Sequence, residues 1–163
     1  MWRDANDAPA GAPPRIASAD LTITGLSLDE FRGGFNFDTL QRIYAVINPD
    51  HYFAHADSNG PLLMETFGMH GGPSLMYAIP DPGISVPVER EAGYPLLSSG
   101  YTLLPDGTNP NMFAYHQYKP LAHGLTVRLC AIFPPMTPKV IVDGHKAHMA
   151  IEIWEGAKLA AAG

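Results

Sequence analysis

Hydrophobic positions follow a helical period over residues 39–48 and strand patterns from residue 61 onward. In the segment 39–48, apolar residues recur at helical spacing, at Leu40, Ile43, Val46 and Ile47. Asn48-Pro49 ends this segment, which is the main helix that the sequence predicts. Ser27, followed three residues later by Glu30, predicts a capping box ahead of one brief helical turn.

Short apolar runs separated by turn residues predict about eight strands, arranged mostly as hairpins. The expected elements are a strand at 20–25, a hairpin over 62–79 with its turn at 68–73, a loop at 81–95, a second hairpin over 101–118 and a central strand at 125–133. The segment "KVIVDGHKAHMAIEIW" (139–154) predicts a last hairpin, closed on Asp143-Gly144.

These elements predict a mainly β, α+β fold. An antiparallel β-barrel or a two-sheet sandwich, with the one main helix across an opening, would bury such a set. A curved sheet wrapped round helices is the alternative architecture, although it needs more helix than the pattern shows. Residues 1–17, rich in Ala, Pro, Gly and Asp, predict a flexible N-terminal arm, and 18–163 a single globular domain.

Composition narrows the possible partners. Charged residues make up 16% of the 163 residues, below the ~25% usual for soluble domains, and this low charge favours a homo-oligomer. A net charge of −6 with scattered basic residues argues against nucleic acid. No apolar run is long enough to span a membrane. The lone Cys130 and the absence of an apolar signal core at the N-terminus lead us to expect a cytoplasmic protein.

Glu65 is the leading candidate for a catalytic residue because it lies inside the apolar strand "LLMETF". An isolated buried carboxylate is costly, so this one must be paired, bound to a metal or protonated if both faces are covered. One interpretation places Glu65 toward solvent or against an arginine such as Arg128. The other makes it a ligand-facing base with a raised pKa.

His55, Asp57 and His116 are the other catalytic candidates. On extended backbone, His55 and Asp57 project to the same side and can reach one metal ion. The order of His55-x-Asp57, distal His116 and then Arg128 resembles the pattern of the 2-oxoglutarate-dependent oxygenases. This resemblance covers four residues and implies a metal held by His55, Asp57 and His116. We carry over this ligand set as an alternative, without the family's activity.

Further candidates surround these groups. Residues predicted to bind substrate are Tyr44, Phe67, His70, Tyr77, Tyr115 and Arg128. His148 and Glu152 are predicted to share one face of the last strand, as a solvated pair or as an inward acid/base pair. His145, beside the predicted turn, is expected to be exposed.

The leading hypothesis is a small enzyme that uses carboxylate/histidine acid–base chemistry on an apolar or aromatic small molecule in a barrel-like pocket. Its reaction would be of the lyase, isomerase or cyclase type, with no cofactor or with a divalent metal. Three alternatives stay open: a non-catalytic carrier of a hydrophobic ligand, a non-haem metal-dependent oxygenase, and a structural or assembly subunit.

Overall fold

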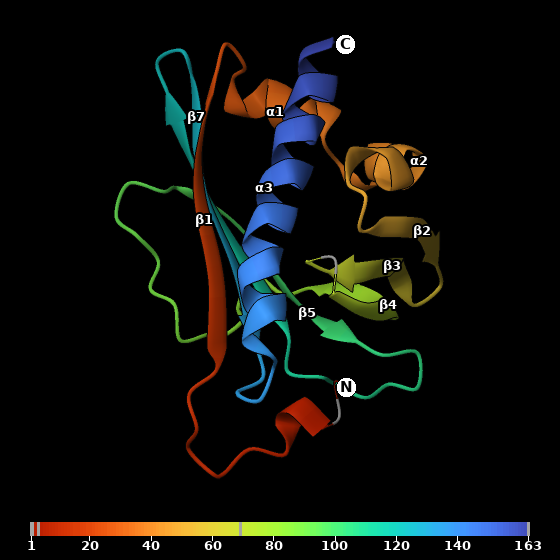
Figure 1. Cartoon of the computed structure of the whole chain (residues 1–163). Helices are drawn as coiled ribbons and strands as arrows, with labels where there is room; N and C mark the ends of the chain where they lie inside the picture. The colour runs from red at the N-terminus through yellow and green to blue at the C-terminus, as the bar shows by residue number, and fades with distance from the viewer. Residues whose placement is uncertain (1, 3, 69, 163) are drawn as a thin grey trace.

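A computed structural model of the chain describes residues 2, 4–68 and 70–162 (Figure 1). Within these residues, seven strands form one antiparallel sheet in the order β1-β7-β6-β5-β4-β3-β2. The strands are β1 (Arg15–Thr24), β2 (His51–Asp57), β3 (Gly60–Phe67), β4 (His70–Pro80), β5 (Leu96–Leu103), β6 (Phe113–Leu121) and β7 (Gly124–Phe133). The helices are a 3-10 turn (Asp4–Asn6), α1 (Leu28–Gly34), α2 (Phe37–Ile47) and α3 (Lys139–Ala162).

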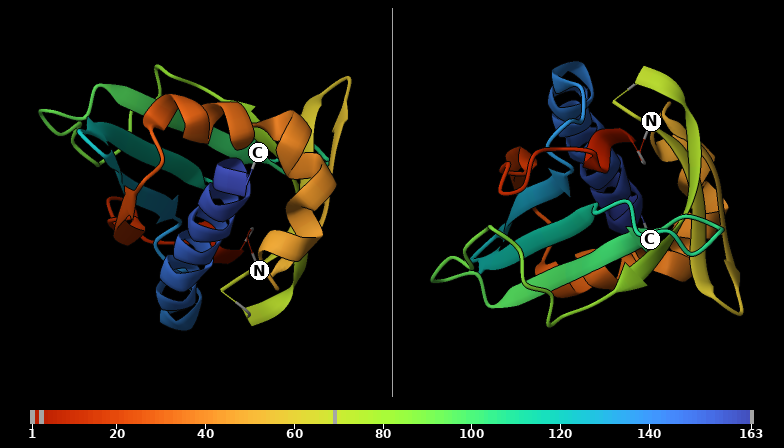
Figure 2. Two further views of the ribbon diagram at one scale, coloured as in Figure 1. Left: turned by 90° about the horizontal axis from the view of Figure 1, so that it is seen from above. Right: turned by 90° about the horizontal axis from the view of Figure 1, so that it is seen from below.

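The mainly β, α+β class with one main helix is confirmed. All seven strands belong to a single sheet, which curves around α3, so the curved-sheet alternative describes the architecture (Figures 1 and 2). Helices α1 and α2 connect the two edge strands, β1 and β2. Among the described residues, no helix has the length and apolar character that a membrane crossing requires. The main core lies where α3 packs on β1, β7 and α1.

The hairpin predicted at 139–154 is wrong, because this segment forms the 24-residue helix α3. Ala147, Met149, Ile151 and Ile153 occupy alternate positions and would share one face of a strand, yet Met149 and Ile153 are buried while Ala147 and Ile151 are exposed. Its buried residues recur at helical spacing instead: Ile141, Val142, His145, His148, Met149, Ile153, Gly156 and Ala157. The alternation of apolar residues mimics a strand, and Asp143-Gly144 mimics a hairpin turn.

The other predicted elements agree with the structure. Ser27 and Glu30 form the capping box of α1, and Asn36 caps α2. Both hairpins are present, as β3–β4 and β5–β6, and β7 lies between β1 and β6 as a central strand. The segment 81–95 is a loop without strands; it packs over the outer face of the sheet, against Cys130 and Ile132.

The N-terminal segment packs against the domain where the structure describes it. The Trp2 side chain is buried, donates a hydrogen bond from Nε1 to Ser74 Oγ at 2.8 Å and lies against the rings of Phe67 and Phe133. Strand β1 begins at Arg15, so the last residues of the predicted arm belong to the sheet. Residues 1 and 3 of that arm lie outside the described residues.

A close backbone contact fixes α3 against the end of β3. Gly144, in the second turn of α3, faces Gly68, whose φ of +64° suits glycine. A Cβ atom on Gly144 would stand 2.5 Å from the Gly68 carbonyl oxygen. The two glycines therefore let the helix approach the sheet more closely than side chains permit.

We expect Gly144→Ala to lower the free energy of unfolding by about 1–3 kcal/mol, although alanine ordinarily favours helix over glycine. Urea denaturation measures this change. Gly33→Ala in α1 is the matched control, because a Cβ atom there meets open space. A Gly144→Ala protein as stable as the control would show that the close contact does not constrain α3.

Candidate functional site

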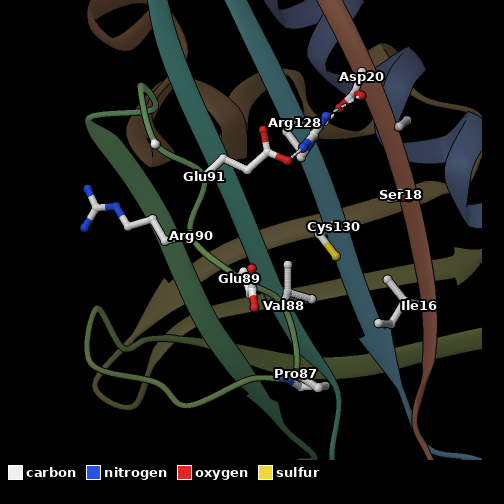
Figure 3. Close-up of a pocket in the computed structure, with 12 residues that line it drawn as sticks. Ile16, Ser18, Asp20, Pro87, Val88, Glu89, Arg90, Glu91, Arg128 and Cys130 are labelled. Carbon is white, nitrogen blue, oxygen red and sulfur yellow. Dashed lines mark hydrogen bonds and ion pairs between the residues drawn. The ribbon is translucent and has the colours of Figure 1, made fainter.

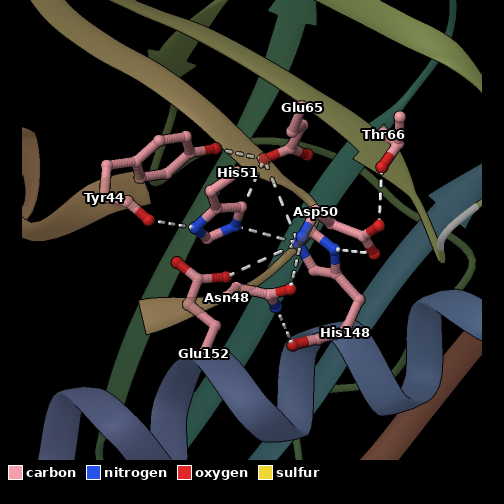
Figure 4. A network of polar contacts seen from close by, with 8 residues as sticks. All are labelled: Tyr44, Asn48, Asp50, His51, Glu65, Thr66, His148 and Glu152. Carbon is pink, nitrogen blue, oxygen red and sulfur yellow. Dashed lines mark hydrogen bonds and ion pairs between the residues drawn. The ribbon is translucent and has the colours of Figure 1, made fainter. Parts of the chain in front are cut away.

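A cluster of polar side chains lies buried between the sheet and α3 (Figure 4). We call four residues here the His–Glu cluster: the buried His51, Glu65 and His148, and the half-buried Glu152. His51 is the first residue of β2 and pairs in register with Glu65 of β3, while His148 and Glu152 stand one turn apart on the inner face of α3. Three distant segments thus meet at one point.

Three ligand-type atoms converge in this cluster. The Nε2 atoms of His51 and His148 are 3.2 Å apart. Glu65 Oε2 lies 3.6 Å from the first and 4.0 Å from the second. His51, Glu65 and His148 are the three residues whose ligand atoms approach one another closely enough to hold a metal ion. All three residues are buried.

The hydrogen bonds at Nδ1 fix the tautomers of the two imidazoles. His51 Nδ1 lies 3.1 Å from the Tyr44 carbonyl oxygen, and His148 Nδ1 lies 3.0 Å from Asp50 Oδ2. Both partners are acceptors, so each Nδ1 carries the proton. The Nε2 atoms of the two rings then face each other and Glu65.

Asp50 is held in place by groups that come from three elements. The Thr66 hydroxyl donates to Asp50 Oδ1 at 2.6 Å, while Asp50 Oδ2 accepts from His148. Asn48 accepts from the Asp50 backbone N–H and donates to the His148 carbonyl oxygen at 2.9 Å. This network orients the imidazole of His148 and joins the end of α2 to α3.

Glu65 is held by the Tyr44 hydroxyl, which donates to Oε2, the same oxygen that faces the two histidines. Burial raises the pKa of Glu65, although the nearby His148 and the Tyr44 hydrogen bond oppose that rise. Burial and, to a smaller extent, the nearby His148 lower the pKa of His51 to about 3. Tyr44 also stacks on His51, with ring centroids 3.7 Å apart.

Glu152 connects the cluster with two cavities. Its Oε2 lies 3.9 Å from His148 Nε2, and burial raises its pKa to about 7. An inner chamber of about 160 Å³ and an outer cavity of about 710 Å³ are both lined by Glu152, Met149 and His116. The inner chamber is otherwise mainly apolar and also reaches Glu65 and His148. A small molecule in these cavities would lie directly beside the cluster.

The structure brings four of the sequence-predicted residues to this site. Glu65 and Tyr44 belong to the cluster, and Phe67 and His116 line the inner chamber. His55, Asp57 and His70 are exposed, so His55, Asp57 and His116 do not converge as metal ligands. Asp57 instead accepts a hydrogen bond from the Tyr77 hydroxyl at 2.7 Å.

Tyr115 and Arg128 face the other side of the sheet. Tyr115 packs with the loop 81–95, and Arg128 pairs with Asp20 and Glu91 rather than with Glu65 (Figure 3). The groove beside them has a volume of about 810 Å³, and Cys130 lines it. Burial raises the pKa of this thiol to about 11, so it stays protonated near neutrality.

Sequence reasoning missed His51 and Asp50 at the centre of the site. His145 was expected to be exposed, yet it is buried between Phe67, Phe133 and His148. The inward alternative for His148 and Glu152 agrees with their place in the structure, although they lie on a helix and not on a strand. Their spacing of four suits a helix, because such residues share one face of it.

Comparisons with known proteins show the fold. No family model matches the chain, and no curated protein matches it. A norcoclaurine synthase point mutant from Thalictrum flavum, in complex with a transition-state analogue, matches with a TM-score of 0.60 and 9% identity, over 93% of this chain and 97% of that one. A truncated norcoclaurine synthase from the same plant matches with a TM-score of 0.58 and 13% identity, over 93% and 96%. The chain therefore shares the fold of these structures.

We expect Thr66→Val to lower the free energy of unfolding by about 1–3 kcal/mol, because it leaves a buried carboxylate oxygen of Asp50 without its hydroxyl donor. Thr102→Val is the matched control: that hydroxyl is buried and has no hydrogen-bond partner among the residues that the structure describes. Its loss should leave stability unchanged or raise it. Equal destabilisation in the two variants, measured by urea denaturation, would contradict the role of Thr66.

Proposed function

We propose that the protein is a metal-dependent enzyme that acts on a small, mainly apolar molecule bound between the sheet and α3. The observation that carries this proposal is the convergence of His51 Nε2, His148 Nε2 and Glu65 Oε2 within a buried site. Two imidazoles and one carboxylate are a frequent ligand set for zinc and for non-haem iron. This ligand set differs from the one that the sequence resemblance implied, which was His55, Asp57 and His116.

The spacing of the imidazole atoms supports a cation between them. Atoms that bind a tetrahedral zinc ion at ~2.0–2.1 Å stand roughly 3.3–3.4 Å apart. The two Nε2 atoms are 3.2 Å apart. Burial lowers the pKa of His51 to about 3, so this ring, whose Nδ1 faces the Tyr44 carbonyl oxygen, can offer the lone pair of Nε2 to a divalent cation.

Outer partners hold each of the three ligands, as is usual around metal-binding histidines. The Tyr44 carbonyl oxygen holds His51, Asp50 holds His148, and the Tyr44 hydroxyl holds Glu65. Such partners fix the ring orientation and make the imidazole a better ligand. This arrangement distinguishes the cluster from a chance meeting of polar residues.

Glu152 and the cavities support a reaction at this site. A bound divalent metal lowers the pKa of a water molecule and polarises a substrate oxygen. Glu152 stands between the ligands and the outer cavity, where its carboxylate can accept a proton or complete the metal coordination. We therefore infer hydrolytic or lyase-type chemistry. One of the similar structures holds a transition-state analogue, so the same fold accommodates a small molecule in that protein.

A metal-free acid–base enzyme is the second candidate. The specific observation in its favour is the hydrogen bond from the Tyr44 hydroxyl to the buried Glu65, in a site where burial raises the pKa of that carboxyl. In this mechanism Glu65 is the base and His148 a proton partner. The two candidates differ in whether the cluster binds a metal.

We expect the protein, dialysed against a slight excess of Zn²⁺ and measured by elemental analysis, to hold about one equivalent of zinc. His148→Ala should hold less than about one tenth of an equivalent, because it removes one of three ligands. His55→Ala, an exposed histidine outside the cluster, is the matched control and should bind zinc as the unaltered protein does.

Zinc binding should also stabilise the fold, by about 2.7 kcal/mol when free zinc is a hundredfold above the dissociation constant. Retention of a full equivalent by His148→Ala, or an equal loss in His55→Ala, would contradict the assigned site. A protein that binds no metal would favour the acid–base candidate. Iron in place of zinc in the freshly purified protein would favour an oxygenase.

A further inference from the structure

The imidazole of His116 is held in a single tautomer by the neighbouring strand. Strands β6 and β7 pair at Ala114–Ala131 and at Gln117–Arg128, and between these pairs the backbone N–H of Cys130 donates to His116 Nδ1 at 3.2 Å. Because Nδ1 accepts this bond, the neutral ring carries its proton on Nε2. Burial lowers the pKa of His116 to about 4, so the ring is neutral near pH 7.

The Nε2–H group of His116 faces space that a ligand can fill. Within the described part of the chain, His116 makes its hydrogen bond through Nδ1, and Nε2 has no partner. The residue lines both the inner chamber and the outer cavity. A donor that is fixed in direction and turned toward a cavity is suited to an acceptor on a bound molecule.

Tyr118 supplies a second donor on the same face of β6. Residues two apart on a strand project to the same side, and Tyr118 lines the outer cavity as His116 does. Burial, followed by the charge of Glu152, raises the pKa of Tyr118, so its hydroxyl keeps its proton. Among the described residues, this hydroxyl has no hydrogen-bond partner.

We propose that His116 Nε2–H and the Tyr118 hydroxyl form a donor pair that binds the carbonyl oxygen of the substrate. The substrate class is then a carbonyl compound rather than a hydrocarbon or a cation. The reaction described below rests on the proposed function, whereas binding of the carbonyl oxygen does not.

The donor pair has a defined part in a hydrolytic step. Water attacks the carbonyl carbon, its proton passes to Glu152, and the π electron pair of the C=O bond moves onto the oxygen. His116 and Tyr118 stabilise the negative charge that develops there, as donors of an oxyanion hole do. When the C=O bond forms again, the bond to the leaving group breaks, and Glu152 gives its proton to that group. Glu152 comes from α3 and the donors come from β6, so the carbonyl group would lie between the helix and the sheet.

The size of the inner chamber limits the part of the substrate that it holds. A cavity of about 150 Å³ in another protein binds benzene, and the inner chamber here has about 160 Å³. Its walls include Leu63, Phe67, Met76 and Phe133. A single six-membered ring fits this space, with a carbonyl substituent directed toward His116. Larger portions must occupy the outer cavity.

Two probes of nearly the same shape test the donor pair without knowledge of the natural substrate. Acetophenone carries a carbonyl oxygen where α-methylstyrene carries a CH₂ group. Titration calorimetry on the full chain should give tighter binding of acetophenone. Tyr118→Phe and His116→Leu should each weaken acetophenone binding about five- to tenfold and change α-methylstyrene binding less than about twofold. Tyr77→Phe, which alters an exposed tyrosine–aspartate contact, is the matched control and should change neither.

Binding of α-methylstyrene also shows that each variant is folded. Equal losses for the two probes would mean that the residues only shape the cavity, and unchanged acetophenone binding would mean that they contact no ligand oxygen. Either result overturns the proposal. Repeating the titration with EDTA separates the two claims: a preference for acetophenone that persists without metal supports the donor pair even if the metal site fails.

Discussion

Two imidazole nitrogens and a carboxylate oxygen meet inside this protein, and the fold must compensate the cost of burying them. His51 Nε2, His148 Nε2 and Glu65 Oε2 lie within 4.0 Å of one another in a buried site. Buried polar groups are tolerated only when they are paired. The Tyr44 carbonyl oxygen and Asp50 accept hydrogen bonds from the two imidazoles, and the Tyr44 hydroxyl donates one to Glu65. A cation would bind the atoms of the three groups that face one another.

The curved sheet and α3 together position the residues of this polar cluster. Strands β2 and β3, at one edge of the sheet, carry His51 and Glu65, and the C-terminal helix brings His148 and Glu152 against them. The glycine contact between Gly68 and Gly144 keeps that helix close. His116 of β6 lines both cavities beside the cluster, and Tyr118, on the same face of that strand, lines the outer one. In the proposed function, the groups that would hold a cation come from β2, β3 and α3, and the donors for a substrate come from β6.

The sequence predicted α2, the hairpins β3–β4 and β5–β6, and the strands β1 and β7, because local periodicity and turn residues determine them; it did not predict β2. Glu65 was singled out from the cost of a carboxylate in an apolar strand, and the structure buries it, while its catalytic role stays a prediction. The helix α3 was missed because Asp143-Gly144 and alternating apolar residues imitate a hairpin. Residues His51 and His148 are 97 positions apart, so only the tertiary fold brings them together. The homo-oligomer and the cytoplasmic location stay predictions.

Crystals of the protein grown without chelator would test the metal site most directly, through anomalous diffraction on either side of the zinc absorption edge. The account predicts one strong anomalous peak bonded to His51 Nε2, His148 Nε2 and a Glu65 oxygen. Well-ordered imidazoles at this position with no anomalous peak between them, in protein supplied with zinc, would contradict it. The same map would show whether Glu152 is a fourth ligand or stands free beside the cavity.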